Sequence, residues 1–316
     1  MEITLIGYGN QGRAWAANLR DSGWKVRVCA RASGNAYKTA QEAGFELLLP
    51  EQLVPGDASP ITGLIAVLLP DEEISSFFSK YLALDGKPAA SVSTAQASRS
   101  FLFAHGFSVV YGKLPASPSD DLILCAPKGI GPKLRANYLR GSGEMGVLGV
   151  KQDGSGSAWE KAKVVAHALG LDRVGILNST FEEETYADLL SEQVLLCGAV
   201  HRLLDESVRF LVEKGINPKL ATFECLHELK LIVDMMVEQG IAGMLDRVST
   251  TATFGGLQAA DQLLPEPKLH NDLQKIWAEI QNGSFAAQLS AERAASYVNM
   301  KHELEKYRSG PVETHR

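Results

Sequence analysis

Hydrophobic and polar positions follow two different patterns along this chain of 316 residues. In the first half, short β-branched runs alternate with stretches whose apolar residues recur at helical spacing. This order is typical of an α/β domain, in which a mostly parallel, doubly wound sheet carries helices on both faces. Strands are predicted at Glu2–Ile6, Lys25–Cys29, Leu64–Leu69, Phe101–Ala104, Ser108–Tyr111, Leu122–Cys125 and Val147–Lys151, and helices at Gln11–Asp21, Ala36–Ala43 and Glu72–Leu84.

From about Phe181 onward the strand-like runs end, and long stretches rich in Leu, Ala, Glu and Val carry apolar residues at helical spacing. This pattern predicts a second domain that is all-helical, interrupted at Asn217-Pro218 and at Gly240. Its helices are expected at Glu183–Lys214, Pro218–Gln239, Leu257–Leu264, Leu269–Asn282 and Ala291–Tyr307.

The change of pattern places the domain boundary between Asn178 and Glu183, which gives domains at 1–180 and 181–316. Both lengths suit a single hydrophobic core, since domains have roughly 100 to 200 residues. Two segments rich in small and turn-forming residues, Pro55–Gly63 and Asp85–Ser100, are expected to be surface loops.

Composition narrows the class of protein further. The chain is 45% hydrophobic and 22% charged with a formal net charge of -6, which is typical of a globular protein and gives no reason to expect nucleic acid as a partner. Its first apolar run is too short for a signal peptide or a membrane span, and its four cysteines are widely spaced. We therefore expect a cytoplasmic protein with reduced thiols, no transit peptide and no membrane partner.

A glycine-rich motif follows the first predicted strand and begins the first helix. In Gly7-Tyr8-Gly9-Asn10-Gln11-Gly12, Gly7 suits a tight turn, Gly9 a close approach to pyrophosphate, and Gly12 close helix packing. The free N–H groups at such a helix start favour phosphate groups. The motif predicts a Rossmann-type dinucleotide site, whereas the structural alternative is a glycine-rich turn without a ligand.

The end of the second predicted strand bears on which dinucleotide is bound. An acidic residue there would accept a hydrogen bond from a ribose 2′-hydroxyl, and a basic residue would accommodate a 2′-phosphate. The segment after Cys29 contains Arg31 and Ser33 but no acid. We therefore expect NADPH, with Arg31 facing the phosphate and Ser33 as a further donor, unless Arg31 is an ordinary solvated loop residue.

Carboxylates recur at helical spacing in the second half. Glu184, Asp188 and Glu192 follow one another at intervals of four, as do Glu224 and Glu228, so each set lies along one side of a helix. Like charges at this spacing weaken a helix, so the carboxylates need either water or a cation.

A solvated helix face is one explanation for these carboxylates. The other is a metal site, because the neighbouring residues are apolar nearly all round both helices, which predicts burial. With no thiolate in the set, oxygen ligands favour Mg²⁺ or Mn²⁺ over zinc, and four or more carboxylates suit two ions. His227 lies nearby and is expected to have a structural role.

Taken together, these motifs resemble those of ketol-acid reductoisomerases, also called acetohydroxy acid isomeroreductases, in their short class I form. The resemblance covers nearly the whole chain in order, and the segment from Phe223 to Asp234 is its most specific part. The matching segments are Ile6–Gly12, Leu68–Glu72, Phe103–Phe107, Ala126–Gly129, Glu183–Thr185, Asp188–Leu189, Glu192–Gln193 and Phe223–Asp234.

For the metal site, the resemblance implies two Mg²⁺ ions. Asp188 would bridge both ions, Glu192 would complete one, and Glu224 and Glu228 would reach the other, partly through water. Glu184 would lie behind these ligands.

For the remaining polar residues, the resemblance implies a cavity bordered by His105 and Lys128. Ser249 would donate a hydrogen bond to the substrate carboxylate, and Glu228 or a hydroxide held by the metal is a better candidate than His105 for the general base. The helical domain would be knotted and would interlock with that of a second subunit, so that Glu224, Glu228 and Ser249 reach the site of the neighbouring chain.

The implied activity is a Mg²⁺-dependent alkyl migration in a 2-hydroxy-3-oxo acid such as 2-acetolactate, followed by NADPH reduction to the 2,3-dihydroxy acid, a reaction of branched-chain amino acid biosynthesis. A homodimer or higher homo-oligomer with sites shared between chains is expected. The chain departs from the family pattern at Arg247, Thr250 and Thr253, near Ser249. Two alternatives are a metal-independent β-hydroxy acid dehydrogenase and a catalytically silent, NADPH-binding paralogue with a scaffolding role.

Overall fold

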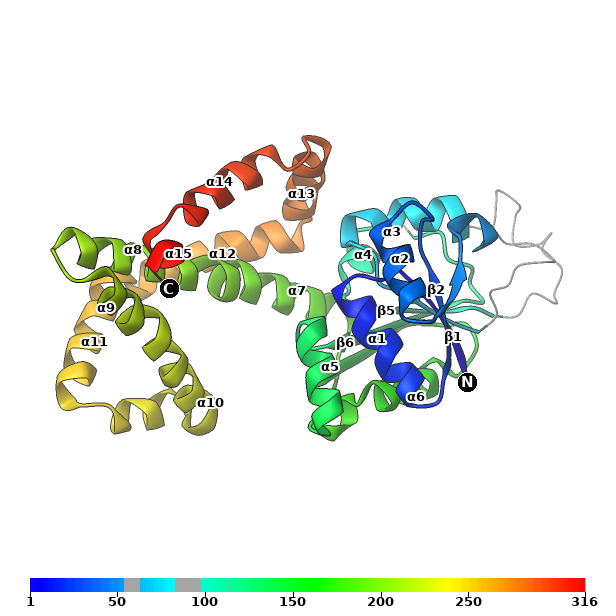
Figure 1. The fold of residues 1–316 in the computed structure, drawn as a ribbon, viewed down its shortest axis with the longest axis horizontal. Coiled ribbons are helices and arrows are strands. Elements are labelled where there is room, and N and C mark those ends of the chain that lie inside the picture. The colour runs from blue at the N-terminus through cyan, green and yellow to red at the C-terminus, as the bar shows by residue number, and fades with distance from the viewer. Residues whose placement is uncertain (54–62, 83–97, 113, 316) are drawn as a thin grey trace. The chain divides into compact units, whose positions relative to one another are not determined.

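The computed structural model describes residues 1–53, 63–82, 98–112 and 114–315. Its described residues form two compact units, Met1–Thr185 and Tyr186–Arg316 (Figure 1). Among the helices described, none is long and apolar enough to cross a membrane. Each unit is considered separately below.

The first unit is built on an eight-stranded sheet with the order β3-β2-β1-β4-β5-β6-β7-β8. All neighbouring pairs are parallel except β6 and β7, which run antiparallel. The strands are β1 Glu2–Ile6, β2 Lys25–Cys29, β3 Glu46–Leu48, β4 Leu64–Val67, β5 Ser100–Phe103, β6 Asp121–Pro127, β7 Gly146–Asp153 and β8 Ile176–Asn178. The order reverses direction between β1 and β4, and in open α/β sheets the crevice at such a point is where ligands bind.

Helices cover both faces of this sheet (Figure 1). They are α1 Asn10–Asp21, α2 Asn35–Glu42, α3 Asp71–Phe77, α4 Phe107–Val110, α5 Gly131–Arg140 and α6 Ala158–Leu169, with short helical turns at Pro50–Leu53, Phe78–Leu82 and Leu171–Arg173. Side chains of α1 and α6 pack on one face, and those of α3 and α4 on the other. This confirms the predicted doubly wound architecture.

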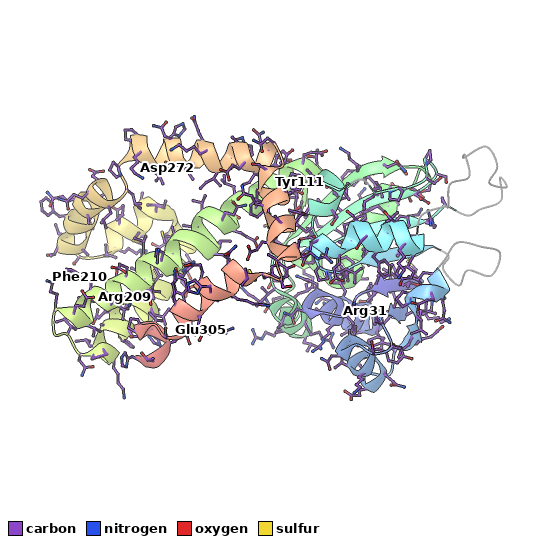
Figure 2. The ribbon with its side chains drawn as sticks, turned by 90° about the horizontal axis from the view of Figure 1, so that it is seen from above. Arg31, Tyr111, Arg209, Phe210, Asp272 and Glu305 are labelled. Atoms are coloured by element: carbon purple, nitrogen blue, oxygen red, sulfur yellow. The ribbon has the colours of Figure 1, made fainter. Side chains whose placement is uncertain are left out.

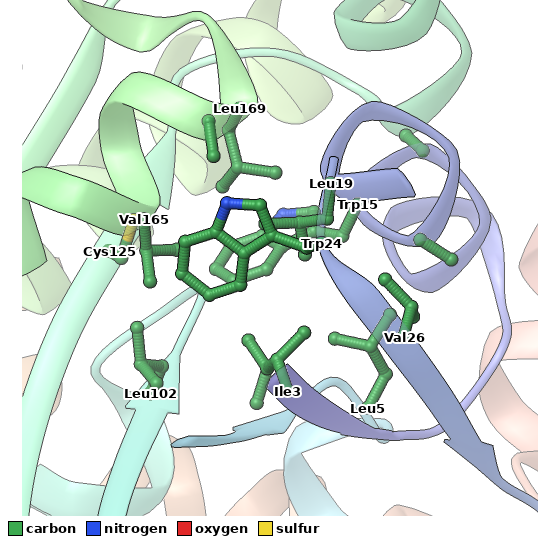
Figure 3. Packing of buried hydrophobic residues seen from close by; sticks show 14 of the residues in the cluster. Ile3, Leu5, Trp15, Leu19, Trp24, Val26, Leu102, Cys125, Val165 and Leu169 are labelled. Atoms are coloured by element: carbon green, nitrogen blue, oxygen red, sulfur yellow. The ribbon is translucent and has the colours of Figure 1, made fainter. Parts of the chain in front are cut away.

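Alternation along the central strands explains why both faces are apolar. In β5, Leu102 faces the α1 and α6 layer, while Phe101 and Phe103 face the opposite layer, because successive side chains point to opposite sides of a strand. Trp15 of α1 is fully buried in the first layer (Figure 3). Burial of such large side chains contributes about 1.5 to 3 kcal/mol each, so the sheet is a rigid base for the site at its edge.

Several predicted elements of this unit need correction. Ser108–Tyr111 was expected to be a strand, but Phe107–Val110, which includes Val109 and Val110, is helix α4. Both valines pack against the core from this helix, so burial and not strand propensity accounts for them. Helices α5 and α6 and the three-residue strands β3 and β8 were not predicted.

Other predictions of this unit differ in extent or lie outside the described residues. The helix expected at Glu72–Leu84 is divided into α3 and the π-helical turn Phe78–Leu82. The loops expected at Pro55–Gly63 and Asp85–Ser100 fall mostly on 54–62 and 83–97, outside the described residues. At their ends, Ser100 is the first residue of β5.

The second unit is helical throughout its described length, apart from short connections, as the sequence predicted. Helix α7, Phe181–Ser191, leads into it and continues as the π-helical segment η5, Glu192–Ala199. The remaining elements are α8 Val200–Glu213, α9 Pro218–Thr222, the π-helical segment η6 Phe223–His227, α10 Glu228–Arg247, α11 Thr250–Leu263, α12 Glu266–Gln281, α13 Ser284–Ala294, α14 Val298–Arg308 and α15 Pro311–His315.

The two predicted interruptions are confirmed. The side chain of Asn217 accepts hydrogen bonds from the amides of Lys219 and Leu220 and begins α9, with Pro218 in the first helical position. Gly240 has φ 76° and ψ 171°, which breaks the helical path inside α10. A residue with a side chain would be strained at this φ.

The helix predicted at Ala291–Tyr307 is wrong as a single element. Ser296 and Tyr297 both adopt positive φ, at 57° and 59°, and separate α13 from α14. Glu292 accepts the amide hydrogens of Asn299 and Met300 and so caps the second helix. Neither glycine nor proline marks this break, so the sequence carried no ordinary signal for it.

The prediction that the helices carrying the carboxylates are buried is also wrong for a single chain. Leu195 and Leu196 in η5, Phe223 in η6 and Leu231 in α10 are all more than half exposed. The described residues of one chain therefore do not cover these apolar side chains.

Candidate active site

The glycine-rich turn lies at the carboxyl end of β1, at the point where the strand order reverses. Gly7 has φ 102°, and a Cβ on it would lie 2.6 Å from the carbonyl oxygen of Leu68, so only glycine fits. A Cβ on Gly12 would lie 2.4 Å from the carbonyl oxygen of Gly7, so Gly12 keeps the turn tight. The sequence predicted close helix packing at Gly12, which lies in the first turn of α1.

Gly9 differs from these two glycines. It precedes α1, and a Cβ on it would meet no atom of the described residues within 4 Å. Open space beside the start of a helix, where backbone N–H groups have no partners within the helix, suits a phosphate group. The residues of this turn therefore fit a dinucleotide.

The side chains of the turn are placed in different ways. The Tyr8 ring is buried and packs edge-on against Phe45, so a cofactor would contact Tyr8 through its backbone. Burial raises the pKa of its hydroxyl above the ordinary value, although the charges of Arg13 and Arg20 oppose the shift. Asn10 is exposed and Gln11 is half-buried.

Arg31 and Ser33 lie in the turn that follows β2, and both side chains are exposed. Arg31 is labelled in Figure 2. The carbonyl oxygen of Arg31 accepts a hydrogen bond from the amide of Gly34 at 2.9 Å, which closes this turn before α2. Residues 30–35, which form this turn and the start of α2, include no aspartate or glutamate. The turn can therefore present a guanidinium and a hydroxyl to a ligand at the end of β2.

A buried carboxylate organises the polar residues at the same edge of the sheet. The side chain of Glu184, in α7, is only 1% exposed. Its oxygens accept from Lys128 Nζ at 2.7 Å and from the amide of Gly106 at 3.1 Å, and His105 Nδ1 lies 3.1 Å away. Lys128 directly follows β6, and His105 follows β5, so three elements meet at this carboxylate.

The charge of Glu184 is held by these partners. Burial alone would raise its pKa, but the hydrogen bond and charge of His105 and those of Lys128 outweigh it and lower the pKa below 4.5. Glu184 is therefore ionised at neutral pH. The sequence placed Glu184 behind the metal ligands but did not predict its contacts with Gly106, Lys128 and His105.

Gly106 was missed as a site residue. A Cβ there would lie 2.1 Å from Thr185 Oγ1 and 2.7 Å from the carbonyl oxygen of Phe181, so the loop after β5 touches α7 through bare backbone. Thr185 is fully buried at this contact. The His-Gly pair was visible in the sequence, but no local pattern shows that a helix passes so close.

The described residues offer a partial set of metal ligands on α7. Asp188 lies one turn after Glu184 on this continuous helix, and carboxylate oxygens of the two residues come within 4.8 Å of each other. Hard oxygen donors of this kind suit Mg²⁺ or Mn²⁺. The residues present thus fit a divalent cation.

The other predicted ligands lie in the second unit. Glu192 is the first residue of η5, Glu224 lies in η6, and Glu228 begins α10. None of the three belongs to a close group of metal-ligating atoms among the described residues. The ring of His227 stacks on that of Phe223, with centroids 5.1 Å apart, which suits a structural role.

Ser249 is the N-cap of α11. Its Oγ accepts a hydrogen bond from the amide of Ala252 at 3.1 Å. A hydroxyl that accepts in this way still has its own hydrogen to donate. The position is therefore compatible with both a structural role and a hydrogen bond to a substrate.

A doubly wound sheet with a glycine turn at its switch point, followed by a helical unit rich in carboxylates, defines a class of two-domain oxidoreductases that use a pyridine nucleotide. Comparison with known proteins narrows this class. The model for the acetohydroxy acid isomeroreductase NADPH-binding domain matches residues 1–175, and that for the ketol-acid reductoisomerase C-terminal domain matches 181–315. The chain therefore belongs to the ketol-acid reductoisomerase family.

Individual relatives agree with this assignment. The chain is 38% identical to the ketol-acid reductoisomerase (NADP(+)) of Methanothermobacter thermautotrophicus, over 95% of this chain and 87% of the relative. It is 36% identical to that of Methanosphaera stadtmanae, over 94% and 86%. A solved structure of an NADH-preferring ketol-acid reductoisomerase from an uncultured archean has a TM-score of 0.85 and 33% identity, covering 99% of this chain and 92% of the other.

Proposed function

We propose that this protein is a ketol-acid reductoisomerase that converts a 2-hydroxy-3-oxo acid such as 2-acetolactate into a 2,3-dihydroxy acid by alkyl migration and reduction. The proposal depends above all on the match of both domain models in order along the chain. Such a reaction needs a polar site. Buried Glu184 supplies one together with Lys128 and His105, at the same edge of the sheet as the glycine turn.

NADPH is the proposed reductant, held by the segment from Gly7 to Gly12 and by Arg31 and Ser33. When bound, it supplies the hydride for the reduction step. Support comes from the NADPH-binding domain model, from the relatives named for NADP(+), and from the basic, acid-free turn after β2. Relatives in this family are named for NADP(+) and for NADH preference. Turnover measured with NADPH and with NADH at equal concentration tests the assignment, and a strong preference for NADH would overturn it.

Two Mg²⁺ ions are the proposed metals, with Asp188, Glu192, Glu224 and Glu228 as ligands. When bound, they would polarise the ketone and lower the pKa of the adjacent hydroxyl. The oxygen donors on α7 and the acidic residues that begin η5 and α10 support this set. Glu184 would lie behind the ligands and orient them.

Other residues of the chain would stabilise charge, transfer a proton and bind the substrate. Lys128 and His105, both turned toward Glu184, would place positive charge beside the reacting oxygens, and Glu228 is the proposed general base. Ser249 would hold the substrate carboxylate with the hydroxyl hydrogen that its cap interaction leaves available.

The proposed domain roles are NADPH binding by residues 1–180 and metal and substrate binding by residues 181–316. We further propose a homodimer or larger homo-oligomer in which knotted helical domains interlock and Glu224, Glu228 and Ser249 reach the neighbouring chain's site. The exposed apolar side chains of the second unit support this arrangement. A cytoplasmic location is proposed from the same biosynthetic role.

The proposal is tested by following NADPH oxidation with 2-acetolactate and with 2-aceto-2-hydroxybutyrate, with and without Mg²⁺. We expect turnover that requires Mg²⁺ and stops when EDTA is added. The Asp188→Asn variant should lose the rearrangement and still bind NADPH, because the glycine turn is unchanged.

Two outcomes would favour the alternatives. Activity that survives EDTA would indicate a metal-independent β-hydroxy acid dehydrogenase. Tight binding of NADPH and Mg²⁺ without turnover on either substrate would indicate a catalytically silent paralogue. This alternative is motivated by Arg247, Thr250 and Thr253, which depart from the family pattern near Ser249.

A further inference from the structure

The side chain of Gln11 joins two segments that are far apart in sequence. Its Nε2 donates a hydrogen bond of 2.8 Å to the carbonyl oxygen of Gly129, which follows Lys128 directly. Gln11 itself belongs to the glycine-rich turn at the start of α1. One carboxamide therefore links the candidate dinucleotide turn to the loop that carries a candidate catalytic lysine.

The backbones of the two segments are also in close contact. A Cβ on Gly131 would lie 2.0 Å from the carbonyl oxygen of Asn10 and 2.9 Å from the amide nitrogen of Gln11. Only a glycine allows this approach. On the other side of the loop, the amide of Lys128 donates to the carbonyl oxygen of Met145 at 2.8 Å.

The orientation of the Gln11 carboxamide leaves one atom without a partner. Its Nε2 must face the Gly129 oxygen, because the flipped amide would place two acceptors together. Its Oε1 is then buried and has no hydrogen-bond partner among the described residues. A buried acceptor without a partner is unfavourable, so this oxygen suits a donor on a ligand, such as a hydroxyl or carboxamide of the cofactor.

We infer that Gln11 is a positioning residue: it fixes the Lys128 loop against the glycine turn and so couples cofactor binding to the placement of the lysine that contacts Glu184. The coupling to the cofactor rests on the proposed function, whereas the link between Gln11 and Gly129 does not. Gln11 acts through the Gly129 carbonyl, and the Lys128 ammonium is 2.7 Å from Glu184 at the end of the same path.

Hydrogen–deuterium exchange of the intact protein tests the link without measuring activity. Gln11→Met keeps the length of the side chain but removes the donor, and we expect amide exchange in 128–131 to become at least about fivefold faster in the absence of cofactor. Gln41→Met, at an exposed position of α2, is the matched control and should leave exchange of this segment unchanged. Equal exchange in the wild type and both Gln11→Met and Gln11→Glu would overturn the inference.

Kinetics then separate positioning from simple cofactor contact. At saturating NADPH, the kcat of Gln11→Met should remain about tenfold below that of the wild type, and the loss should largely vanish in a Lys128→Met background. If saturating NADPH restores kcat fully, Gln11 contacts the cofactor only and the inference fails. If the exchange result is as expected but no NADPH binds in a fluorescence titration, the proposed function fails while the link between Gln11 and Gly129 stands.

Discussion

Glu184 is the residue whose surroundings say most about the chemistry of the site. It is a buried carboxylate with two cationic or potentially cationic partners and a backbone donor. Breaking a buried charge pair leaves the remaining charge without compensation, which is costly. Substitution of Glu184 should therefore lower both the catalytic rate and the free energy of unfolding, and the two effects can be measured separately.

We expect Glu184→Gln to lower kcat by about 10- to 100-fold, the range typical of residues that orient metal ligands. The amide would still fill the space and could accept a hydrogen bond, but it would no longer supply the negative charge that pairs with the Lys128 ammonium. Steady-state kinetics with 2-acetolactate measure the effect, and NADPH affinity by fluorescence should change little. Glu183→Gln, at an exposed position next to it, is the control and should retain nearly full activity.

The same variant predicts a pH dependence of stability. Because the pKa of Glu184 is lowered in the folded protein, its contribution is present above the ordinary value of 4.5 and is lost as the pH falls through the lowered pKa. At pH 7 we expect the free energy of unfolding of Glu184→Gln to be about 2 kcal/mol smaller than that of the wild type. The difference should shrink below pH 4.5, as measured by urea denaturation of the metal-free protein; a constant difference across the range would contradict the assignment.

At the level of elements, the π-helical segment η5 stands out because it begins at a proposed metal ligand, Glu192. Such segments are rare and occur frequently at functional sites. A Cβ on Gly198 would lie 1.9 Å from the carbonyl oxygen of Gln193, so η5 in this form requires glycine there. The direction of the Glu192 side chain relative to that of Asp188 therefore depends on Gly198, which lies further along the same segment.

We expect Gly198→Ala to weaken Mg²⁺ binding about tenfold and to lower the free energy of unfolding by about 1 to 3 kcal/mol, because the methyl group forces η5 to rearrange. Isothermal titration with Mg²⁺ and thermal denaturation measure the two effects. Gly256→Ala is the control: a Cβ there meets no described atom within 4 Å, and alanine should stabilise α11 slightly. Unchanged Mg²⁺ binding in Gly198→Ala would remove the role assigned to η5.

The elements also show where sequence reasoning succeeded and where it failed. Strands such as β1 and β2 were located to the residue because short β-branched runs mark them. The short strands β3 and β8 and the break at Ser296 have no such local signal. The contact of Gly106 with α7 and the link from Gln11 to Gly129 depend on tertiary packing, which no spacing in the sequence encodes.

At the level of the whole molecule, exposed apolar side chains are concentrated in the helical unit. Monomeric proteins rarely expose large contiguous apolar patches, so this distribution favours association with another chain. Phe210, labelled in Figure 2, is one example. The most exposed examples in this unit are Val237 at 81%, Ile241 at 67%, Leu263 at 69%, Phe254 at 65% and Leu196 at 62%.

Sedimentation tests this reading directly. The wild type should sediment as a dimer or larger oligomer, and Val237→Glu should weaken the association at least about tenfold, because a carboxylate would be buried at the interface. Mg²⁺-dependent turnover should fall in parallel if the site is shared between chains. Val174→Glu, at an exposed apolar position of the first unit, should leave the oligomer intact. A folded, active monomer would contradict the proposed sharing of sites.

Helix α7 carries Glu184, which contacts the loops after β5 and β6, and also carries Asp188, the proposed bridging ligand. Each residue of an α-helix turns the chain by about 100° and advances it by about 1.5 Å. Inserting or deleting one residue between positions 184 and 188 would therefore swing every later carboxylate to another side of the helix. Glu184 and Asp188 therefore lie on the same side of α7 only while four residues of helix separate them, so an insertion or deletion between them would not be tolerated.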